Sequence, residues 1–317
     1  MFKDYYSLAK AGLVYGNLIT VIGGFALGST VAARFVAGNS TAIGSINFAL
    51  LLATLIGISL VMASGCVFNN YIDRDIDARM SRTKDRALVT KKISGSAAIA
   101  FAIVLGVIGF FMLAFFTNAL TVAVAAAGFF VYVVLYSLWA KRSSIHGALV
   151  GSISGATPPV VGYAAASGRL EDGGALILFA IMVLWQMPHF YAIAIRRADD
   201  YAKGEIPVLP VKRGIHATKV AMLLYIIAFI VAASLLTVFG YTGYAYLTIT
   251  LLLGLAWLAL CVKGFTIPDK GTGRGEKVHD DDAGNYDANQ LWARKMFFFS
   301  LVVMVVLFIT ITIGAVV

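Results

Sequence analysis

The spacing of charged residues constrains the fold of this chain more than any other feature. Seven stretches contain no Lys, Arg, Asp or Glu, and they are 11–33, 35–72, 93–140, 143–168, 173–195, 220–262 and 296–317. A membrane-spanning helix needs roughly 20 mainly apolar residues. The stretch 93–140 divides near Thr117 and the stretch 220–262 divides near Gly240, so each can hold two spans. We therefore expect an all-α integral membrane protein with about nine spans, at 11–33, 46–69, 94–116, 119–139, 146–167, 173–195, 218–238, 243–263 and 295–316.

The composition supports a membrane protein and excludes several other classes. Of the residues, 60% are apolar and 13% are charged, whereas a soluble domain carries about twice that charged fraction. The mean hydropathy of +0.87 excludes a disordered chain, a coiled coil and a secreted disulfide scaffold. Cys66 and Cys261 lie near span ends that face a reducing compartment, so we expect free thiols. The net charge of +9 follows from membrane topology, and we expect no nucleic-acid partner.

Positive charge sets the orientation of the spans. With a cytoplasmic N-terminus, 23 of the 25 Lys and Arg residues fall on the cytoplasmic side, and only Arg34 and Arg169 fall outside. The C-terminus is then periplasmic, and the absence of a targeting extension before the first span favours a bacterial inner membrane. Of the 16 acids, 14 also fall on the cytoplasmic side, although acids contribute little to topology. This face therefore uses carboxylates and bases together.

The first polar cluster lies where the second span ends. In a continuous helix, Asn69, Asp73 and Asp77 recur every four residues and share one face, whereas Asp75 points away. Two carboxylates at this spacing repel each other, and Mg²⁺ between them would remove the repulsion. The alternative is a solvated helix whose acids pair with Arg74 and Arg79. On spacing alone, the two interpretations stay open.

Cations follow these acids directly, at Arg82, Lys84 and Arg86. Arginine binds phosphate in a bidentate way and lysine acts as a point charge. Carboxylates for a metal ion beside cations for anionic oxygens indicate a diphosphate site. The alternative use of these cations is to set topology and contact lipid headgroups.

A second polar cluster follows the sixth span and contains Asp199, Asp200 and Lys203. It lies 126 residues after the first cluster, and each cluster follows an even-numbered span. This predicts two four-helix pseudo-repeats in a single domain, 1–140 and 141–264, around a central cavity open to the cytoplasmic side. A flexible cytoplasmic loop at 265–293 and a ninth helix at 294–317 would complete the chain. We do not expect the three adjacent acids at 280–282 to form a metal site.

Two further features lie within spans. His189 lies near the cytoplasmic end of the sixth span, close to Trp185 and Gln186. A polar group inside the membrane is a functional candidate by default, although a lone His often only bonds a neighbouring helix. Pro158 and Pro159 are expected to kink or break the fifth span.

These residues carry a resemblance to a known family. The pattern Asn69-Asn70-x-x-Asp73-x-x-x-Asp77 resembles the first aspartate motif of the UbiA-type intramembrane prenyltransferases. The runs around Cys66, Arg82-Thr83, Thr157-Pro158-Pro159, Trp185-Gln-Met-Pro-His189 and Asp200-Tyr201 are similar to those of the haem O synthase (protoheme IX farnesyltransferase) family, over nearly the whole chain. The wider superfamily has two aspartates separated by three residues in its second motif. Here Ile195 holds the first position and only Asp199 matches, which leaves the second metal position open.

The resemblance implies farnesyl diphosphate and haem b as substrates, haem O and diphosphate as products, and Mg²⁺ as cofactor. The implied metal ligands are Asn69, Asn70, Asp73, Asp77, Asp199 and Asp200. The implied diphosphate-binding residues are Arg82, Lys84, Arg86, Lys141, Arg142 and Lys203. The implied catalytic residues are Asp73, Asp77, Asp199 and His189, with His189 and Trp185 as haem contacts. His189 would either ligate iron or orient a water.

The resemblance also implies binding partners, and two alternative functions stay open. The lipid bilayer surrounds the protein, and haem A synthase or a terminal oxidase assembly are the candidate protein partners. One alternative function is prenyl transfer to an aromatic quinone precursor. The other is a non-catalytic membrane protein that handles haem or transports a solute.

Overall fold

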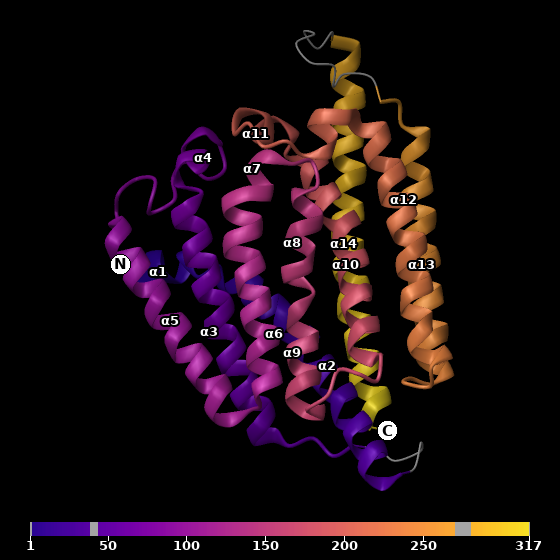
Figure 1. Cartoon of the computed structure of the whole chain (residues 1–317). Coiled ribbons are helices and arrows are strands. Elements are labelled where there is room, and N and C mark those ends of the chain that lie inside the picture. The colour runs from indigo at the N-terminus through magenta and orange to yellow at the C-terminus, as the bar shows by residue number, and fades with distance from the viewer. Residues whose placement is uncertain (1, 39–43, 270–279, 317) are drawn as a thin grey trace.

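The computed structural model describes residues 2–38, 44–269 and 280–316, and this part of the chain is helical without strands (Figure 1). Eight of its helices are long and apolar enough to cross a membrane. In chain order the elements are α1 (Phe2–Leu8), α2 (Ala11–Ala37), α3 (Phe48–Ile72), α4 (Arg74–Arg79), α5 (Gly95–Phe116), α6 (Ala119–Phe130), the π-helix η1 (Val131–Ala140), α7 (Lys141–Ser143), α8 (Gly147–Gly155), α9 (Thr157–Ser167), α10 (Gly174–Arg196), α11 (Ala198–Lys203), α12 (Leu209–Val238), α13 (Tyr244–Lys263), the 3₁₀-helix η2 (Gly264–Thr266) and α14 (Asp280–Val316).

The fifth of the expected spans is divided between two short helices, α8 and α9. Pro158 and Pro159 cannot donate the backbone hydrogen bonds that would continue α8, but a proline fits the first turn of a new helix. The Gln186 side chain of α10 reaches the break and donates from Nε2 to the carbonyl of Ser152, at 3.3 Å. The expected break is confirmed, and it accounts for eight long helices where nine crossings are expected.

Polar residues fix where several of the long helices begin. The side chains of Asn47, Ser94 and Asn118 each accept a hydrogen bond from a backbone N–H in the first turn of α3, α5 and α6, respectively. Such N-caps bond amide groups that have no partner within the helix. These boundaries agree closely with the expected spans that begin at 46, 94 and 119, because the capping residues interrupt the apolar runs.

Glycines bring α2 and α9 into close contact along their length. A Cβ atom added at Gly24 would lie 2.0 Å from the carbonyl oxygen of Pro159, and one at Gly28 would lie 2.5 Å from that of Tyr163. On the opposing helix, a Cβ atom at Gly162 would lie 2.2 Å from the carbonyl oxygen of Val21. Small residues at four-residue spacing allow such approach between helices in lipid. The contact holds the broken fifth span against α2.

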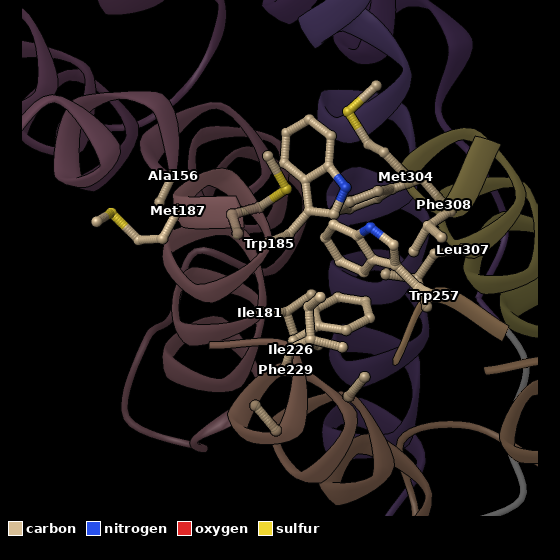
Figure 2. Close-up of a cluster of buried hydrophobic side chains, with 14 of the residues drawn as sticks. Ala156, Ile181, Trp185, Met187, Ile226, Phe229, Trp257, Met304, Leu307 and Phe308 are labelled. Atoms are coloured by element: carbon tan, nitrogen blue, oxygen red, sulfur yellow. The ribbon is translucent and has the colours of Figure 1, made fainter. Parts of the chain in front are cut away.

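The largest apolar core joins the second half of the chain to α14. Figure 2 shows Trp185 of α10 and Trp257 of α13 in the middle of this core, with Met304 and Phe308 of α14 beside them. Trp257 and Phe308 are fully buried. Both cysteines, at positions 66 and 261, are buried free thiols, as expected. The core therefore fixes α10 and α14 against each other, and both helices contribute to the site below.

Short helices cluster at one end of the bundle, which we call the charged end, marked by α4, α7 and α11 in Figure 1. The α4 segment contacts the α11 segment through apolar packing of Ile76 and Met80 against Ile206. Arg79 forms an ion pair with Glu205 at 2.7 Å. The two polar clusters of the sequence are thus joined at this end of the bundle.

The structure corrects the expected loop at 265–293 and the expected start of the ninth helix at 294. The final helix, α14, begins at Asp280; residues 270–279 lie outside the described residues. Trp292 anchors this part of the chain by donating from Nε1 to the carbonyl of Leu260, at 2.9 Å. The seventh span also begins earlier than expected, at Leu209, with a break at Gly214 (φ 83°). The division into two pseudo-repeats stays a prediction.

Candidate active site

A cavity of about 480 Å³ opens at the charged end, and we call it the polar chamber. It receives side chains from five separate parts of the chain. Its charged and polar lining includes Lys10, Asn69, Asp73, Asp77, Arg82, Arg86, Tyr132, Tyr136, Lys141, Arg196, Arg197 and Tyr201. Two carboxylates therefore face one cavity together with several cations.

Asp73 is the most deeply buried acid in this chamber, with its side chain 1% exposed. It caps the end of α3, and its Oδ2 accepts hydrogen bonds from Lys141 Nζ and from Asn69 Nδ2. Its other oxygen, Oδ1, is buried without a hydrogen-bond partner, and an Arg142 nitrogen lies 3.8 Å away. An unsatisfied buried carboxylate oxygen is costly, so Asp73 retains the capacity to bind a cation.

Asp77 lies one turn further, where α4 continues the direction of the chain past a small break at Asp73. Its Oδ2 accepts from Arg86 at 2.6 Å. Arg86 also donates to Asn70 Oδ1 at 2.9 Å, and Asn70 Nδ2 donates to the carbonyl of Leu8 at 2.8 Å. Asn70 thus ties α3 to α1 and orients Arg86, and it is not among the described residues that line the chamber.

Asp75 points away from the chamber, as the helical spacing predicts. Its side chain is 54% exposed and accepts two hydrogen bonds from Arg142, at 2.7 and 2.8 Å. These hydrogen bonds from Arg142 hold the pKa of Asp75 below its usual range. Arg142 thereby braces α7 against the end of α3, where it also donates to the carbonyl of Ile72.

Lys10 is a chamber residue that the sequence reasoning missed. It caps the start of α2 in a left-handed conformation (φ 49°), and its Nζ donates to Asn69 Oδ1 at 2.5 Å. Burial lowers the pKa of Lys10 to about 8. The only sign of Lys10 in the sequence was its position directly before the first span. A cation at that position is also expected from the positive-inside rule alone.

A π-helical segment, η1, forms the wall opposite α3. The Ser137 hydroxyl donates to the carbonyl of Tyr132 and accepts from Asn69 Nδ2 at 3.0 Å. Tyr132 and Tyr136 stack on each other and both line the chamber. Short π-helical segments are frequent at functional sites, and here the wider turn orients two tyrosines and Ser137 toward the carboxylate cluster.

The second polar cluster contributes less to the chamber than the sequence suggests. Asp200 is buried, but its Oδ1 accepts from the backbone N–H of Ser81 at 3.0 Å, which ties α11 to the segment after α4. Asp199, Lys203 and Lys84 are exposed. Among the described residues, Tyr201, Arg196 and Arg197 of this region line the polar chamber, whereas Asp199, Asp200, Lys203 and Lys84 do not.

A second cavity of about 300 Å³ lies next to the first, and we call it the apolar chamber. Leu13, Tyr132, Gly151 and Phe190 line both chambers, so the two are neighbours along the bundle. Its own lining is mainly apolar and includes Trp185, Gln186 and His189 of α10. Gly155, Thr157 and Pro158, which lie at the break between α8 and α9, also line this chamber.

His189 is held by α14. Its Nδ1 lies 2.7 Å from the Ser300 hydroxyl, and Trp185 Nε1 donates to the Ser300 carbonyl at 2.8 Å. The imidazole stacks on Trp185, with ring centroids 4.9 Å apart, and packs against Phe297 at 4.8 Å. Ser300 and Phe297 belong to the ninth span, where the sequence offered no polar motif to mark them.

The two chambers together suit a molecule with an anionic head and an apolar tail. The oxygen atoms of Asn69, Asp73 and Asp77 are ligands that Mg²⁺ prefers. Lys10, Arg86 and Lys141 supply the charge that a diphosphate requires. The adjoining apolar chamber can exclude water from a reactive carbon.

Comparison with known proteins identifies one family, and the similar proteins share one name. Residues 18–275 match the model of the UbiA prenyltransferase family. The chain is 48% identical to a protein named protoheme IX farnesyltransferase from Citrobacter koseri, over 95% of this chain and 91% of the relative. It is 50% identical to a protein of the same name from Sodalis glossinidius, with the same coverage.

Solved structures share the fold at low sequence identity. A structure of digeranylgeranylglyceryl phosphate synthase superposes with a TM-score of 0.71 at 18% identity, over 99% of this chain and 98% of that one. A UbiA homologue from Archaeoglobus fulgidus, bound to DMAPP and Mg²⁺, superposes with a TM-score of 0.55 at 15% identity, over 95% and 99% of the two chains.

Proposed function

The chain belongs to the UbiA prenyltransferase family, in the branch of the protoheme IX farnesyltransferases, and from this premise we propose that it transfers a farnesyl group from farnesyl diphosphate to a vinyl group of haem b. The products are haem O and diphosphate. The vinyl carbon forms a bond to the farnesyl carbon as the bond from that carbon to the diphosphate oxygen breaks. Water adds to the resulting cation, loses a proton and leaves a hydroxyl group.

The observation that carries this proposal is the position of Asp73. Its carboxylate is almost fully buried, one oxygen has no hydrogen-bond partner, and the cations Lys10, Arg86 and Lys141 line the same chamber. A purely structural acid would have both oxygens bonded. A carboxylate poised for a cation, beside cations poised for an anion, supports binding of a metal diphosphate.

The donor set fits Mg²⁺. Asn69, Asp73 and Asp77 present oxygen atoms, and Mg²⁺ is commonly held by one or two carboxylates together with phosphate oxygens and water. When bound, Mg²⁺ would withdraw negative charge from the diphosphate as it leaves. Asp199 and Asp200 remain proposed metal ligands from the resemblance, although Asp200 is committed to the Ser81 amide in this structure.

The chain's own residues perform the remaining tasks. Arg86, Lys141 and Lys10 stabilise the departing diphosphate through charge-assisted hydrogen bonds. Arg82 lines the chamber from the segment after α4 and can do the same. Tyr132 and Phe190, which line both chambers, separate the diphosphate from the apolar chamber, where the allylic carbon is protected from bulk water.

The charge distribution supports one orientation in the membrane. The charged end carries the polar chamber and most basic residues, so it faces the cytoplasm under the positive-inside rule. The N-terminus is then cytoplasmic and the C-terminus periplasmic, in a bacterial inner membrane. Both amphipathic substrates can enter from the bilayer, and haem A synthase or a terminal oxidase assembly would receive the product.

Mass spectrometry of extracted haem tests the function. Purified protein is incubated with haem b, farnesyl diphosphate and Mg²⁺. We expect a new haem, heavier by a farnesyl group plus water, that does not form in EDTA. Unmodified haem from folded protein would overturn the proposal, and release of diphosphate with an aromatic acid instead of haem would assign the quinone-type acceptor. Absence of Mg²⁺-dependent diphosphate release with every acceptor would indicate a non-catalytic protein.

A further inference from the structure

We propose that haem b binds along α10, with its iron on Nε2 of His189 and a propionate on Arg196. This inference rests on the proposed function, because it takes haem as the acceptor. It goes further by assigning the axial ligand and the residue that orients the macrocycle. The motifs in the sequence assigned no function to Arg196.

The packing of His189 leaves one part of its ring available to the apolar chamber. Trp185 and Phe297 pack against the imidazole, and Nδ1 is bonded to Ser300 on α14. His189 nevertheless lines the apolar chamber. Among the described residues, Nε2 has no hydrogen-bond partner, so it is the ring nitrogen that remains for a ligand in the chamber.

The hydrogen bonds of Ser300 set the tautomer of His189. The Ser300 hydroxyl lies 2.6 Å from the carbonyl of Phe297, and because a carbonyl can only accept, we assign the one hydroxyl proton to this bond. Toward His189 it must therefore accept, so the proton of the neutral imidazole lies on Nδ1 and the lone pair on Nε2. A neutral imidazole with a lone pair on Nε2, oriented through Nδ1–H, is the form that ligates metal ions.

Arg196 lies on the same face of α10 as His189, two turns nearer the charged end. Seven residues correspond to about 700° of rotation, which is about 20° short of two full turns, and to a rise of about 10.5 Å. That rise is comparable to the separation between the iron and the propionate carboxylates of a haem. Arg196 lines the polar chamber and His189 lines the apolar chamber, so one macrocycle could reach both.

Phe297 connects the two proposed contacts. Its ring packs against His189 and also lies 5.5 Å from the Arg196 guanidinium carbon, in a cation–π arrangement. An arginine can bind a propionate carboxylate in a bidentate way. The acidic edge of the haem would then lie toward the polar chamber, and its apolar part would lie against Phe297.

Haem binding without farnesyl diphosphate or Mg²⁺ tests the assignment separately from catalysis. The probes are haem b and its dimethyl ester, in which both propionates are esterified. We expect the wild-type protein to bind haem b at least about tenfold more tightly than the ester, because the ester loses the charge-assisted hydrogen bond to the propionate. Arg196→Gln should abolish this preference, whereas Arg213→Gln, an exposed cation outside both chambers, should retain it.

The axial ligand is tested by absorption and electron paramagnetic resonance spectra of the ferric complex. His189→Gly should lose the histidine-ligated signature, and added imidazole should restore it. Ser300→Ala should weaken the ligation while preserving the haem preference over the ester. An unchanged spectrum in His189→Gly, or an unchanged preference in Arg196→Gln, would overturn the assignment even if haem O forms. Failure of haem O formation with both signatures present would instead contradict the proposed function.

Discussion

Replacing Asp73 by Asn tests whether this carboxylate acts in the polar chamber through its charge. The substitution keeps the size of the side chain and its capacity to accept from Lys141, but it removes the negative charge that faces the chamber. We expect turnover of farnesyl diphosphate to fall strongly while haem binding is retained, because the proposed haem contacts lie on α10.

The structure gives a scale for the effect. Asp73 Oδ1 lies 3.8 Å from the nearest Arg142 nitrogen, and two unit charges at that distance interact by about 4 kcal/mol at an effective dielectric constant of about 20. The chamber is open to solvent, which reduces this value. Removal of one preorganised group that stabilises developing charge costs about 100-fold to 1000-fold in turnover, which is of the same order as this scale, so we expect a loss of that size in kcat/KM.

Asp75→Asn is the matched control for this experiment. Asp75 is two residues away, carries the same charge and forms an ion pair with Arg142, but it is exposed and points away from the chamber. Exposed ion pairs contribute about 0–1 kcal/mol, so activity should change less than about fivefold. The assay is diphosphate release with haem b as acceptor, beside haem titration and size-exclusion chromatography on the same preparations.

Two outcomes would refute the reasoning about Asp73. Equal losses of activity in the two variants would show that the position of the charge is irrelevant. A parallel loss of haem binding and turnover in Asp73→Asn would indicate disruption of the bundle rather than removal of a metal-binding charge.

Three other predictions follow from the same contacts. Lys10→Met should raise the KM for farnesyl diphosphate at least about tenfold, by loss of a charge-assisted contact, while the KM for haem is unchanged; a change confined to haem would remove Lys10 from the diphosphate site. Mg²⁺ and farnesyl diphosphate together should raise the melting temperature by more than the sum of their separate effects, because each neutralises charge that opposes the other, and additive shifts would contradict a shared site. Gly24→Ala should destabilise the protein by about 1–3 kcal/mol through overpacking against Pro159, whereas Gly314→Ala, which meets no atom within 4 Å, should leave the melting temperature unchanged.

Much of the fold could be predicted because the membrane imposes a simple pattern. Charge-free runs of sufficient length must be helices, since lipid offers no partners for an open backbone. Pro158 and Pro159 marked the break in the fifth span, because neither can donate the backbone hydrogen bond that a continuous helix needs. The start of α14 could not be predicted from charge, because Asp280 and the residues after it form a helix that extends beyond the apolar region.

The site was predictable where its residues lie on one helix and unpredictable where contacts cross between helices. Helical spacing placed Asn69, Asp73 and Asp77 together, and it placed Asp75 apart. No spacing rule relates Lys10 or Ser300 to those residues, because their contacts depend on the packing of α2 and α14 against the rest of the bundle.

The ion pairs of the polar chamber show why contacts between helices matter for function. Lys141 and Arg86 bond to Asp73 and Asp77 in this structure, so the carboxylates and the cations neutralise each other. A diphosphate without a metal ion would be repelled by the two carboxylates, and a divalent cation without a diphosphate would be repelled by the cations. A metal diphosphate offers each group a partner of opposite charge, and the ion pairs that hold the chamber together can be exchanged for contacts with the substrate. The sequence supplies both sets of residues, but their pairing across α3, α7 and the segment after α4 is what makes the exchange chemically reasonable.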